Sequence, residues 1–203
     1  MKTIHATIAK LIATGGKVIF EIGAHKGEDT AHLASIKGSV VHAFECDPRN
    51  ILTRLPANVR INYSAVSNHN GTQDFWLSEK PGAQWTCSSS LLLPKKHLEE
   101  HPQIKFDRRV EVRCTTLDTY CESNRIEAID FIWMDVQGAE HLVFEGGNSI
   151  LKNTHFIFTE YADNEQFRTQ KPLADLLLIL GKNWRVVEKW DYDVLLINDN
   201  FKM

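Results

Sequence analysis

The chain has 203 residues, of which 43% are hydrophobic and 24% are charged. This length and balance are typical of one globular domain with a buried core, and they exclude a low-complexity or fibrous protein. The formal net charge of -3 gives no general attraction to nucleic acid or acidic membranes, so we predict no nucleic-acid partner.

The sequence contains no signal for a membrane or an export route. The longest apolar run, residues 173–180, contains Asp175 and is too short to cross a bilayer. The cysteines show neither a Cys-x-x-Cys pair nor a zinc-site spacing, which indicates reduced thiols. We therefore expect a cytoplasmic protein without a membrane span. No metal ligand is predicted, and the need for a divalent metal stays open.

An apolar run that ends in a glycine turn organises the first part of the chain. Residues 17–22 predict a buried strand, and the turn from Gly23 to Gly27 leads into a helix. Glycine lets the backbone approach a ligand closely. The spacing Glu-x-Gly-x-x-x-Gly differs from the Gly-x-Gly-x-x-Gly of dinucleotide sites. The acid Glu21 before the turn favours S-adenosylmethionine, which carries an ammonium group and ribose hydroxyls but no phosphate.

The remaining elements of the first half follow in chain order. Residues 1–14 have helical apolar spacing, and Asp47 is placed to cap a helix from Pro48 to Leu55. Strands are predicted at 39–45, 59–66 and 72–78. Residues 79–108 lose the regular pattern apart from a short helix at 95–101. An irregular stretch of this length is typical of a lid or binding insertion.

The second half alternates strands with helices. Strands are predicted at 109–115, 128–134 and 155–160, and an antiparallel pair at 184–190 and 193–197. Helices are predicted to begin at Thr116, at Gly138 and at Pro172, the last ending at Gly181. This order predicts an α/β fold, a doubly wound, mostly parallel sheet in a single domain of residues 1–203.

Polar residues follow several predicted strands. They are Glu21, Glu45, Ser67, Asp135 and Glu160. Because ligands of such sheets bind outside the carboxyl ends of the strands, we expect these residues to line one site. The predicted cofactor-binding set is Glu21, Gly23, Ala24, His25, Gly27, Glu45, Cys46, Ala65, Val66, Ser67 and Asp135.

Within this set, individual roles follow from chemistry. Glu45 suits two hydrogen bonds from ribose hydroxyls, and Glu21 suits either the methionine ammonium group or the backbone N–H groups of the turn. Ser67, with Ala65 and Val66, is placed to flank the adenine. Each residue also has a plain structural alternative, as a solvated strand end or part of a tight turn.

Transfer of a group from a bound cofactor requires alignment of the acceptor and, where the acceptor is a hydroxyl, removal of its proton. Asp135, at the end of the strand at 128–134, is the main catalytic candidate, with capping of the next helix as its alternative. Glu160 is a candidate base or acceptor contact. His141 and His25 are the histidines near this edge, and a histidine can act as a base near neutral pH. The predicted catalytic set is Asp135, Glu160 and His141.

With these residues in place, residues 17–160 resemble the FkbM-type S-adenosylmethionine-dependent methyltransferases. The motifs that carry the resemblance are Phe20-Glu21-Ile22-Gly23, Ala43-Phe44-Glu45, Ala65-Val66-Ser67, Thr115-Thr116-Leu117-Asp118 and Asp135-Val136-Gln137-Gly138-Ala139-Glu140. Gln137, Trp133 and His25 depart from the family pattern, which has Glu, Lys and Asn there. The resemblance implies a class I methyltransferase (Rossmann-like) fold, with a seven-stranded sheet whose last strand is antiparallel. It also implies S-adenosyl-L-methionine as cofactor and O-methylation of a sugar, a glycan or another small hydroxylated acceptor, with residues 79–108 on the acceptor side.

Two other readings remain open at this point. One is a nicotinamide-dependent oxidoreductase; the glycine spacing opposes it, and no tyrosine is followed by a lysine four residues later. The other is a non-catalytic domain that retains a nucleoside pocket. The sequence does not name the acceptor or the oligomeric state.

Overall fold

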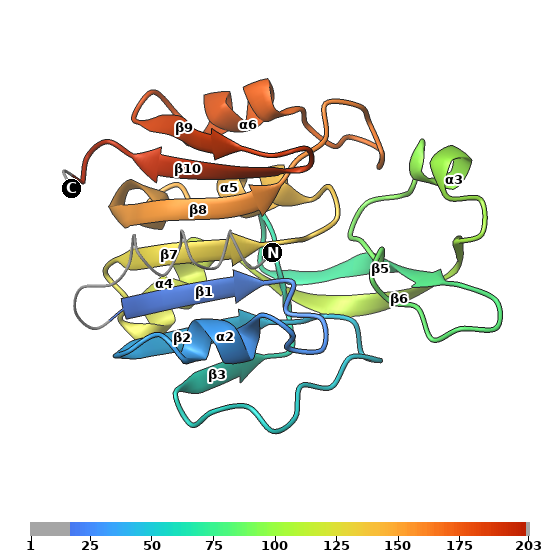
Figure 1. Cartoon of the computed structure of the whole chain (residues 1–203), viewed down its shortest axis with the longest axis horizontal. Helices are drawn as coiled ribbons and strands as arrows, with labels where there is room; N and C mark the ends of the chain where they lie inside the picture. Colours follow the sequence, from blue (N-terminus) through green and yellow to red (C-terminus); the bar gives the residue numbers. More distant parts are fainter. Residues whose placement is uncertain (1–16, 202–203) are drawn as a thin grey trace.

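The computed structural model describes residues 17–201, so the helix predicted for residues 1–14 lies outside it. Seven strands form one sheet in the order β3-β2-β1-β7-β8-β10-β9 (Figure 1). β10 runs antiparallel to both of its neighbours, and the other pairs are parallel. The predicted mostly parallel sheet with an antiparallel last strand is confirmed. Its strands are β1 Lys17–Ile22, β2 Ser39–Phe44, β3 Val59–Asn62, β7 Ile129–Met134, β8 Thr154–Glu160, β9 Trp184–Lys189 and β10 Asp193–Asn198.

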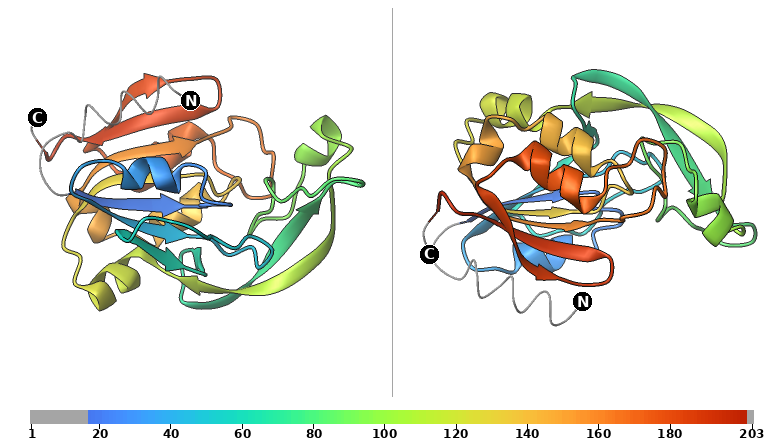
Figure 2. Two further views of the ribbon diagram at one scale, coloured as in Figure 1. Left: turned by 60° about the horizontal axis from the view of Figure 1, so that its bottom comes forward. Right: turned by 90° about the horizontal axis from the view of Figure 1, so that it is seen from above.

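Helices lie on both faces of this sheet (Figure 2). The helix α2 (Thr30–Ala34) covers one face, and α4 (Leu117–Asn124), α5 (Glu140–Glu145) and α6 (Leu173–Leu180) cover the other, with the short 3-10 helix η1 (Ile150–Asn153) before β8. Within β1, Ile19 joins the core under α2, whereas Phe20 joins the core under α4, α5 and α6. Successive side chains of a strand point to opposite faces, so a strand buried on both faces is a continuous apolar run.

A second, three-stranded sheet has the order β4-β6-β5 and was not predicted. It comprises β4 (Ala65–Val66), β5 (Gly71–Glu79) and β6 (Lys105–Thr115). The antiparallel β5 and β6 project from one end of the main sheet, and α3 (His97–Glu100) lies in the chain between them (Figure 1). This sheet has a separate apolar core that includes Phe75 and Phe106.

The predicted helix from Pro48 to Leu55 and the predicted role of Asp47 as its cap are both wrong. No helix forms over residues 48–55. The Asp47 carboxylate accepts a hydrogen bond from the Arg49 backbone N–H at 3.0 Å and the Arg49 guanidinium binds it as well, which closes one turn rather than capping a helix. Arg54 then adopts a left-handed φ of 59°, which a helix does not allow.

The strand predicted at 59–66 is divided between the two sheets. β3 pairs with β2 in the main sheet, whereas β4 pairs with β6 in the second. An alternating pattern shows that residues are extended, but it does not show which strand they pair with.

Candidate active site

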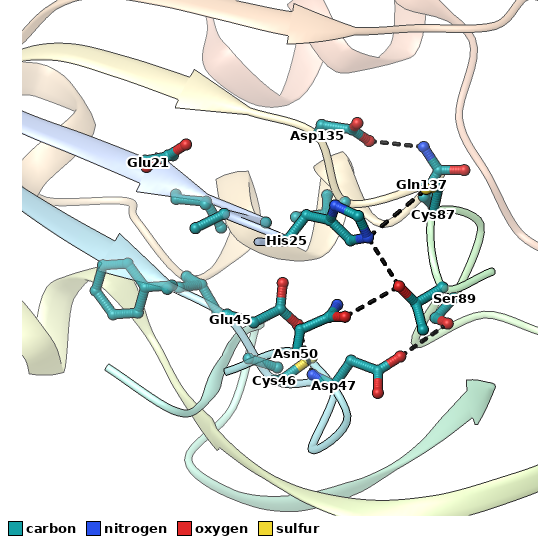
Figure 3. A pocket seen from close by; sticks show the side chains of 18 of the residues that line it. Glu21, His25, Glu45, Cys46, Asp47, Asn50, Cys87, Ser89, Asp135 and Gln137 are labelled. Carbon is teal, nitrogen blue, oxygen red and sulfur yellow. Dashed lines mark hydrogen bonds between the residues drawn. The ribbon is translucent and has the colours of Figure 1, made fainter. Parts of the chain in front are cut away.

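A cavity of about 270 Å³ opens at the carboxyl ends of β1, β2 and β7 (Figure 3). Two groups of residues enclose it, with Asn50, Phe75 and the start of β4 between them. The strand-end wall consists of lining residues at 21–25, 44–47 and 135–137. The insertion wall consists of Thr86, Cys87, Ser89 and Leu91, from the segment predicted to be a lid or binding insertion.

The turn after β1 requires glycine at its first position. Gly23 has a φ of +91°, and a Cβ atom built there would lie 1.8 Å from the backbone oxygen of Asp135. The Gly23 and Ala24 N–H groups both donate to the Phe44 carbonyl, at 3.0 and 2.9 Å. The turn is therefore fixed between β2 and the end of β7, with no room for a side chain at Gly23.

Two acids of the strand-end wall, Glu21 and Glu45, are buried and have raised pKa values. The Glu21 carboxylate accepts a hydrogen bond from the Thr30 hydroxyl, and burial raises the pKa of Glu21 to about 8. Burial also raises the pKa of Glu45 to about 7, although the Asp47 backbone N–H donates to its carboxylate at 2.6 Å. Burial is the largest cause in both cases, so a ligand with a positive charge or hydroxyl donors would favour the ionised forms of Glu21 and Glu45.

A chain of hydrogen bonds joins the glycine turn to the insertion wall. His25, at a left-handed φ of 51°, has its Nε2 atom 2.7 Å from the Thr86 hydroxyl and its Nδ1 atom 3.1 Å from Glu28. The Thr86 hydroxyl donates in turn to the Asn50 side chain at 3.0 Å. Figure 3 shows the His25 ring inside the cavity, beside Cys87. His25 thus serves as a bridge between the two walls.

A second connection runs through Asp47. The Arg49 guanidinium binds its carboxylate twice, at 2.9 and 2.6 Å, and the Ser89 hydroxyl donates to it at 3.0 Å. Burial would raise the pKa of Asp47, but the hydrogen bonds and charge of Arg49 outweigh burial and hold it below its usual value. Arg49 also donates to the Ser78 carbonyl at the end of β5. The ion pair of Asp47 and Arg49 therefore attaches the insertion wall to the segment after β2, through hydrogen bonds of both residues with the Ser89 hydroxyl.

At the other end of the cavity, Gln137 lies between two acids. Its side-chain amide donates to Asp135 at 2.7 Å and to Glu160 at 3.2 Å. Burial raises the pKa of both acids, to about 9 for Glu160, where the charge of Asp135 adds to the effect. A hydrogen bond between the two carboxyl groups lowers the pKa of Asp135 and raises that of Glu160. The two acids are therefore electrostatically linked, and the charge of Asp135 favours the protonated form of Glu160.

The structure brings most of the predicted residues to this cavity. Those that line it are Glu21, Gly23, Ala24, His25, Glu45, Cys46, Ala65, Val66 and Asp135.

Four predicted residues lie outside the lining. The Ser67 hydroxyl donates to Gln73, because Ser67 directly follows β4, which belongs to the second sheet. Gly27 faces Leu55 and Thr30 in the turn. His141 is buried in α5 and does not line the cavity, and Glu160 is linked to the cavity through Gln137.

Several lining residues were not predicted individually. They are Glu28, Asp29, Asp47, Asn50, Phe75, Thr86, Cys87, Ser89, Leu91 and Gln137. The irregular segment 79–108 was predicted as a whole, but pattern alone does not rank the members of a loop. The one local signal for Asp47 was an arginine two residues later, an arrangement typical of a side chain closing its own turn.

The strand order and the acid-lined cavity at the strand ends define a class I S-adenosylmethionine-dependent methyltransferase. Residues 21–194 match the family model described as the methyltransferase FkbM domain, and the chain belongs to that family. This confirms the resemblance, the enzyme class and S-adenosyl-L-methionine as the cofactor. The oxidoreductase and non-catalytic alternatives are set aside.

Several known proteins are similar to this chain. The chain is 37% identical over 186 residues to the 2-O-methyltransferase NoeI of Sinorhizobium fredii (strain NBRC 101917 / NGR234), covering 87% of this chain and 76% of that protein. Among solved structures, an rRNA methylase from Streptococcus thermophilus is 14% identical, with a TM-score of 0.47 over 97% of this chain and 94% of that one. The N-terminal domain of EvdMO1, determined in the presence of SAH and D-fucose, is 12% identical, with a TM-score of 0.47 over 97% of this chain and 81% of that one.

The residues present fit the cofactor. The backbone of the turn from Gly23 to His25 lines the cavity, and two buried acids, Glu21 and Glu45, line it as well. Within residues 17–201, no group of three or more His, Cys, Asp or Glu side chains is arranged to hold a metal ion. In the same part of the chain, no helix is long and apolar enough to span a membrane.

Proposed function

We propose that this protein methylates a hydroxyl group of a sugar or glycan. The observation that carries the proposal is the cavity itself, which is lined by the glycine turn, Glu45 and Asp135, with Glu160 linked to it through Gln137. A 37% identical relative is named as a 2-O-methyltransferase. The 2-hydroxyl of a sugar is therefore the first acceptor position to test.

The strand-end wall holds the cofactor in this proposal. Glu45 accepts hydrogen bonds from the ribose hydroxyls, and Glu21 faces the cationic end. Gly23 and Ala24 allow the close approach, and Ala65 and Val66 contribute apolar surface. When bound, S-adenosyl-L-methionine supplies an electrophilic methyl group on a positively charged sulfur. The protein orients that methyl group and keeps water from it.

Asp135 receives the proton of the acceptor. A sugar hydroxyl is a weak nucleophile while it keeps its proton, so a nearby carboxylate favours transfer. Asp135 lines the cavity, and although burial raises its pKa, hydrogen bonds from Gln137 and Glu160 oppose that effect and favour its carboxylate form. The insertion wall, as part of residues 79–108, forms the acceptor side. His141 lies outside the cavity, and we assign it no catalytic role.

The first experiment is a calorimetric titration with S-adenosylhomocysteine. The wild type should show saturable binding, and Glu45→Gln should bind about 10- to 100-fold more weakly, as expected for the loss of charge-assisted hydrogen bonds. Glu188→Gln, an exposed acid on β9, is the matched control and should bind like the wild type.

Methyl transfer is then measured on a panel of sugars with labelled donor. Transfer to a sugar hydroxyl supports the proposal. Binding of S-adenosylhomocysteine together with transfer only to acceptors that are not sugars would refute the acceptor class, and no binding at all would refute the cofactor site.

A further inference from the structure

Gln137 occupies an unusual backbone position at the acceptor end of the cavity. It follows β7 with a left-handed φ of 52°, and Gly138 after it has a φ of 92°. Non-glycine residues rarely adopt this conformation and pay a conformational cost for it. The backbone here turns the Gln137 side chain back toward the end of its own strand, where its amide reaches Asp135 at 2.7 Å (Figure 3).

The insertion wall holds this turn in place. The Ser90 hydroxyl donates to the Gln137 backbone carbonyl at 2.8 Å, and the Ser90 backbone pairs with Trp76 of β5 through two hydrogen bonds. Ser90 is fully buried. The position of Gln137 is therefore set by the second sheet, although its side chain acts on residues of the first.

The Gln137 amide also sets the spacing of two acids from neighbouring strands. Its nitrogen carries two hydrogens, and it lies 2.7 Å from an Asp135 oxygen and 3.2 Å from a Glu160 oxygen. The two acids also act on each other, since the charge of Asp135 raises the pKa of Glu160, and one shared proton removes the repulsion between two carboxylates in a buried site. The amide is neutral, so it satisfies both acids without changing their joint charge.

We propose that Gln137 is a positioning residue, which holds Asp135 and Glu160 as a pair with one proton and so keeps Asp135 as the carboxylate that accepts the acceptor's proton. This inference rests on the proposed O-methyl transfer. The proposal adds Gln137 to the two acids as a third residue. Gln137 also connects the pair to Ser90 of the insertion, a connection that neither acid makes alone.

Gln137→Met tests the proposal, because methionine has a similar length and no hydrogen to donate. We expect kcat to fall about 10- to 100-fold, while the dissociation constant of S-adenosylhomocysteine stays within about threefold. The acidic limb of the pH–rate profile should move upward by about one pH unit, since the hydrogen bond from Gln137 lowers the pKa of Asp135. Lys182→Met, on an exposed residue after α6, is the control and should match the wild type.

A second readout does not depend on turnover. Carboxyl carbons of the ligand-free protein are followed by NMR across pH, with Glu160→Gln used to assign the Glu160 signal. In Gln137→Met the Asp135 signal should titrate about one pH unit higher than in the wild type. If the wild type methylates no sugar, the proposed function fails, but this titration still decides whether the pair is held as described.

Two results would overturn the proposal. One is an unchanged kcat and an unchanged Asp135 titration in Gln137→Met. The other is a loss confined to S-adenosylhomocysteine affinity, which would make Gln137 a cofactor contact instead. If Gln137→Met does not fold, Ser90→Ala removes the bond to the Gln137 carbonyl together with the one that the Ser90 hydroxyl accepts from the Leu92 N–H, and kcat should then fall about two- to fivefold. Wild-type kcat in a folded Ser90→Ala would count against the link to the insertion wall.

Discussion

The two walls of the cavity are held by different kinds of interaction. In the strand-end wall, backbone hydrogen bonds join adjacent strands, and the Gly23 and Ala24 N–H groups both donate to the Phe44 carbonyl. The insertion wall is attached by side chains, through the Ser89 hydroxyl to Asp47 and the Thr86 hydroxyl to Asn50. Backbone hydrogen bonds do not depend on side-chain identity, whereas each side-chain bond is lost with one substitution.

This difference implies different responses to mutation. The strand-end wall tolerates changes of side chain but not of backbone shape, because its geometry is set by turns that lie against neighbouring strands. The insertion wall tolerates changes of its loop backbone but depends on a few buried polar contacts. Substitutions at Gly23 and Glu21 test the strand-end wall, and a substitution at Arg49 tests the attachment of the insertion wall.

Gly23→Ala should have the largest effect. The new Cβ would lie 1.8 Å from the Asp135 backbone oxygen, and backbone cannot move aside as a flexible side chain can. We expect the free energy of unfolding to fall by more than about 4 kcal/mol, measured by urea denaturation. Gly82→Ala is the matched control, because Gly82 also has a positive φ but nothing within 4 Å of a Cβ; it should cost about 1 kcal/mol. Equal costs at both positions would show that the strand-end wall is softer than the structure indicates.

Glu21→Gln should change how stability depends on pH. The folded pKa of about 8 lies above the unfolded value of 4.5, so the unfolded chain releases this proton first as pH rises. The ligand-free wild type therefore loses stability between about pH 4.5 and 8, and Glu21→Gln should remove part of that loss, on the order of 3 kcal/mol at pH 8. Urea denaturation at pH 5 and pH 8 measures the difference. A variant that is less stable than the wild type at pH 8 would contradict the burial argument.

Arg49→Met should have a smaller effect, confined to the attachment of the insertion wall. It leaves the buried Asp47 carboxylate without its cation, so we expect a loss of about 2 kcal/mol in urea denaturation. Hydrogen exchange should also become faster near Ser89. Arg109→Met is the comparison, because its ion pair with Asp74 is exposed and should contribute about 0.5 kcal/mol or less. Similar losses in both variants would mean that burial of the Asp47 pair adds nothing.

Much of the main sheet was predictable from the chain. Thr116 caps α4 as expected, with its hydroxyl accepting from the Thr119 N–H, and Gly181 ends α6. The wrong predictions occur where a residue makes a different interaction from the one that its local pattern predicts. Asp47 was read as a helix cap because Pro48 follows it, but Arg49 binds its carboxylate and closes the turn.

By itself, the sequence determined the parallel sheet, its glycine turn and the acids at its strand ends, because burial on two faces and tight turns restrict which residues are possible locally. Only the tertiary structure decided that β4 leaves the main sheet, that Thr86 and Ser89 enclose the cavity, and that Gln137 joins Asp135 to Glu160. These features depend on contacts between residues far apart in the chain. Whether such a contact forms depends on where the fold places both residues, and a local sequence pattern does not contain that information.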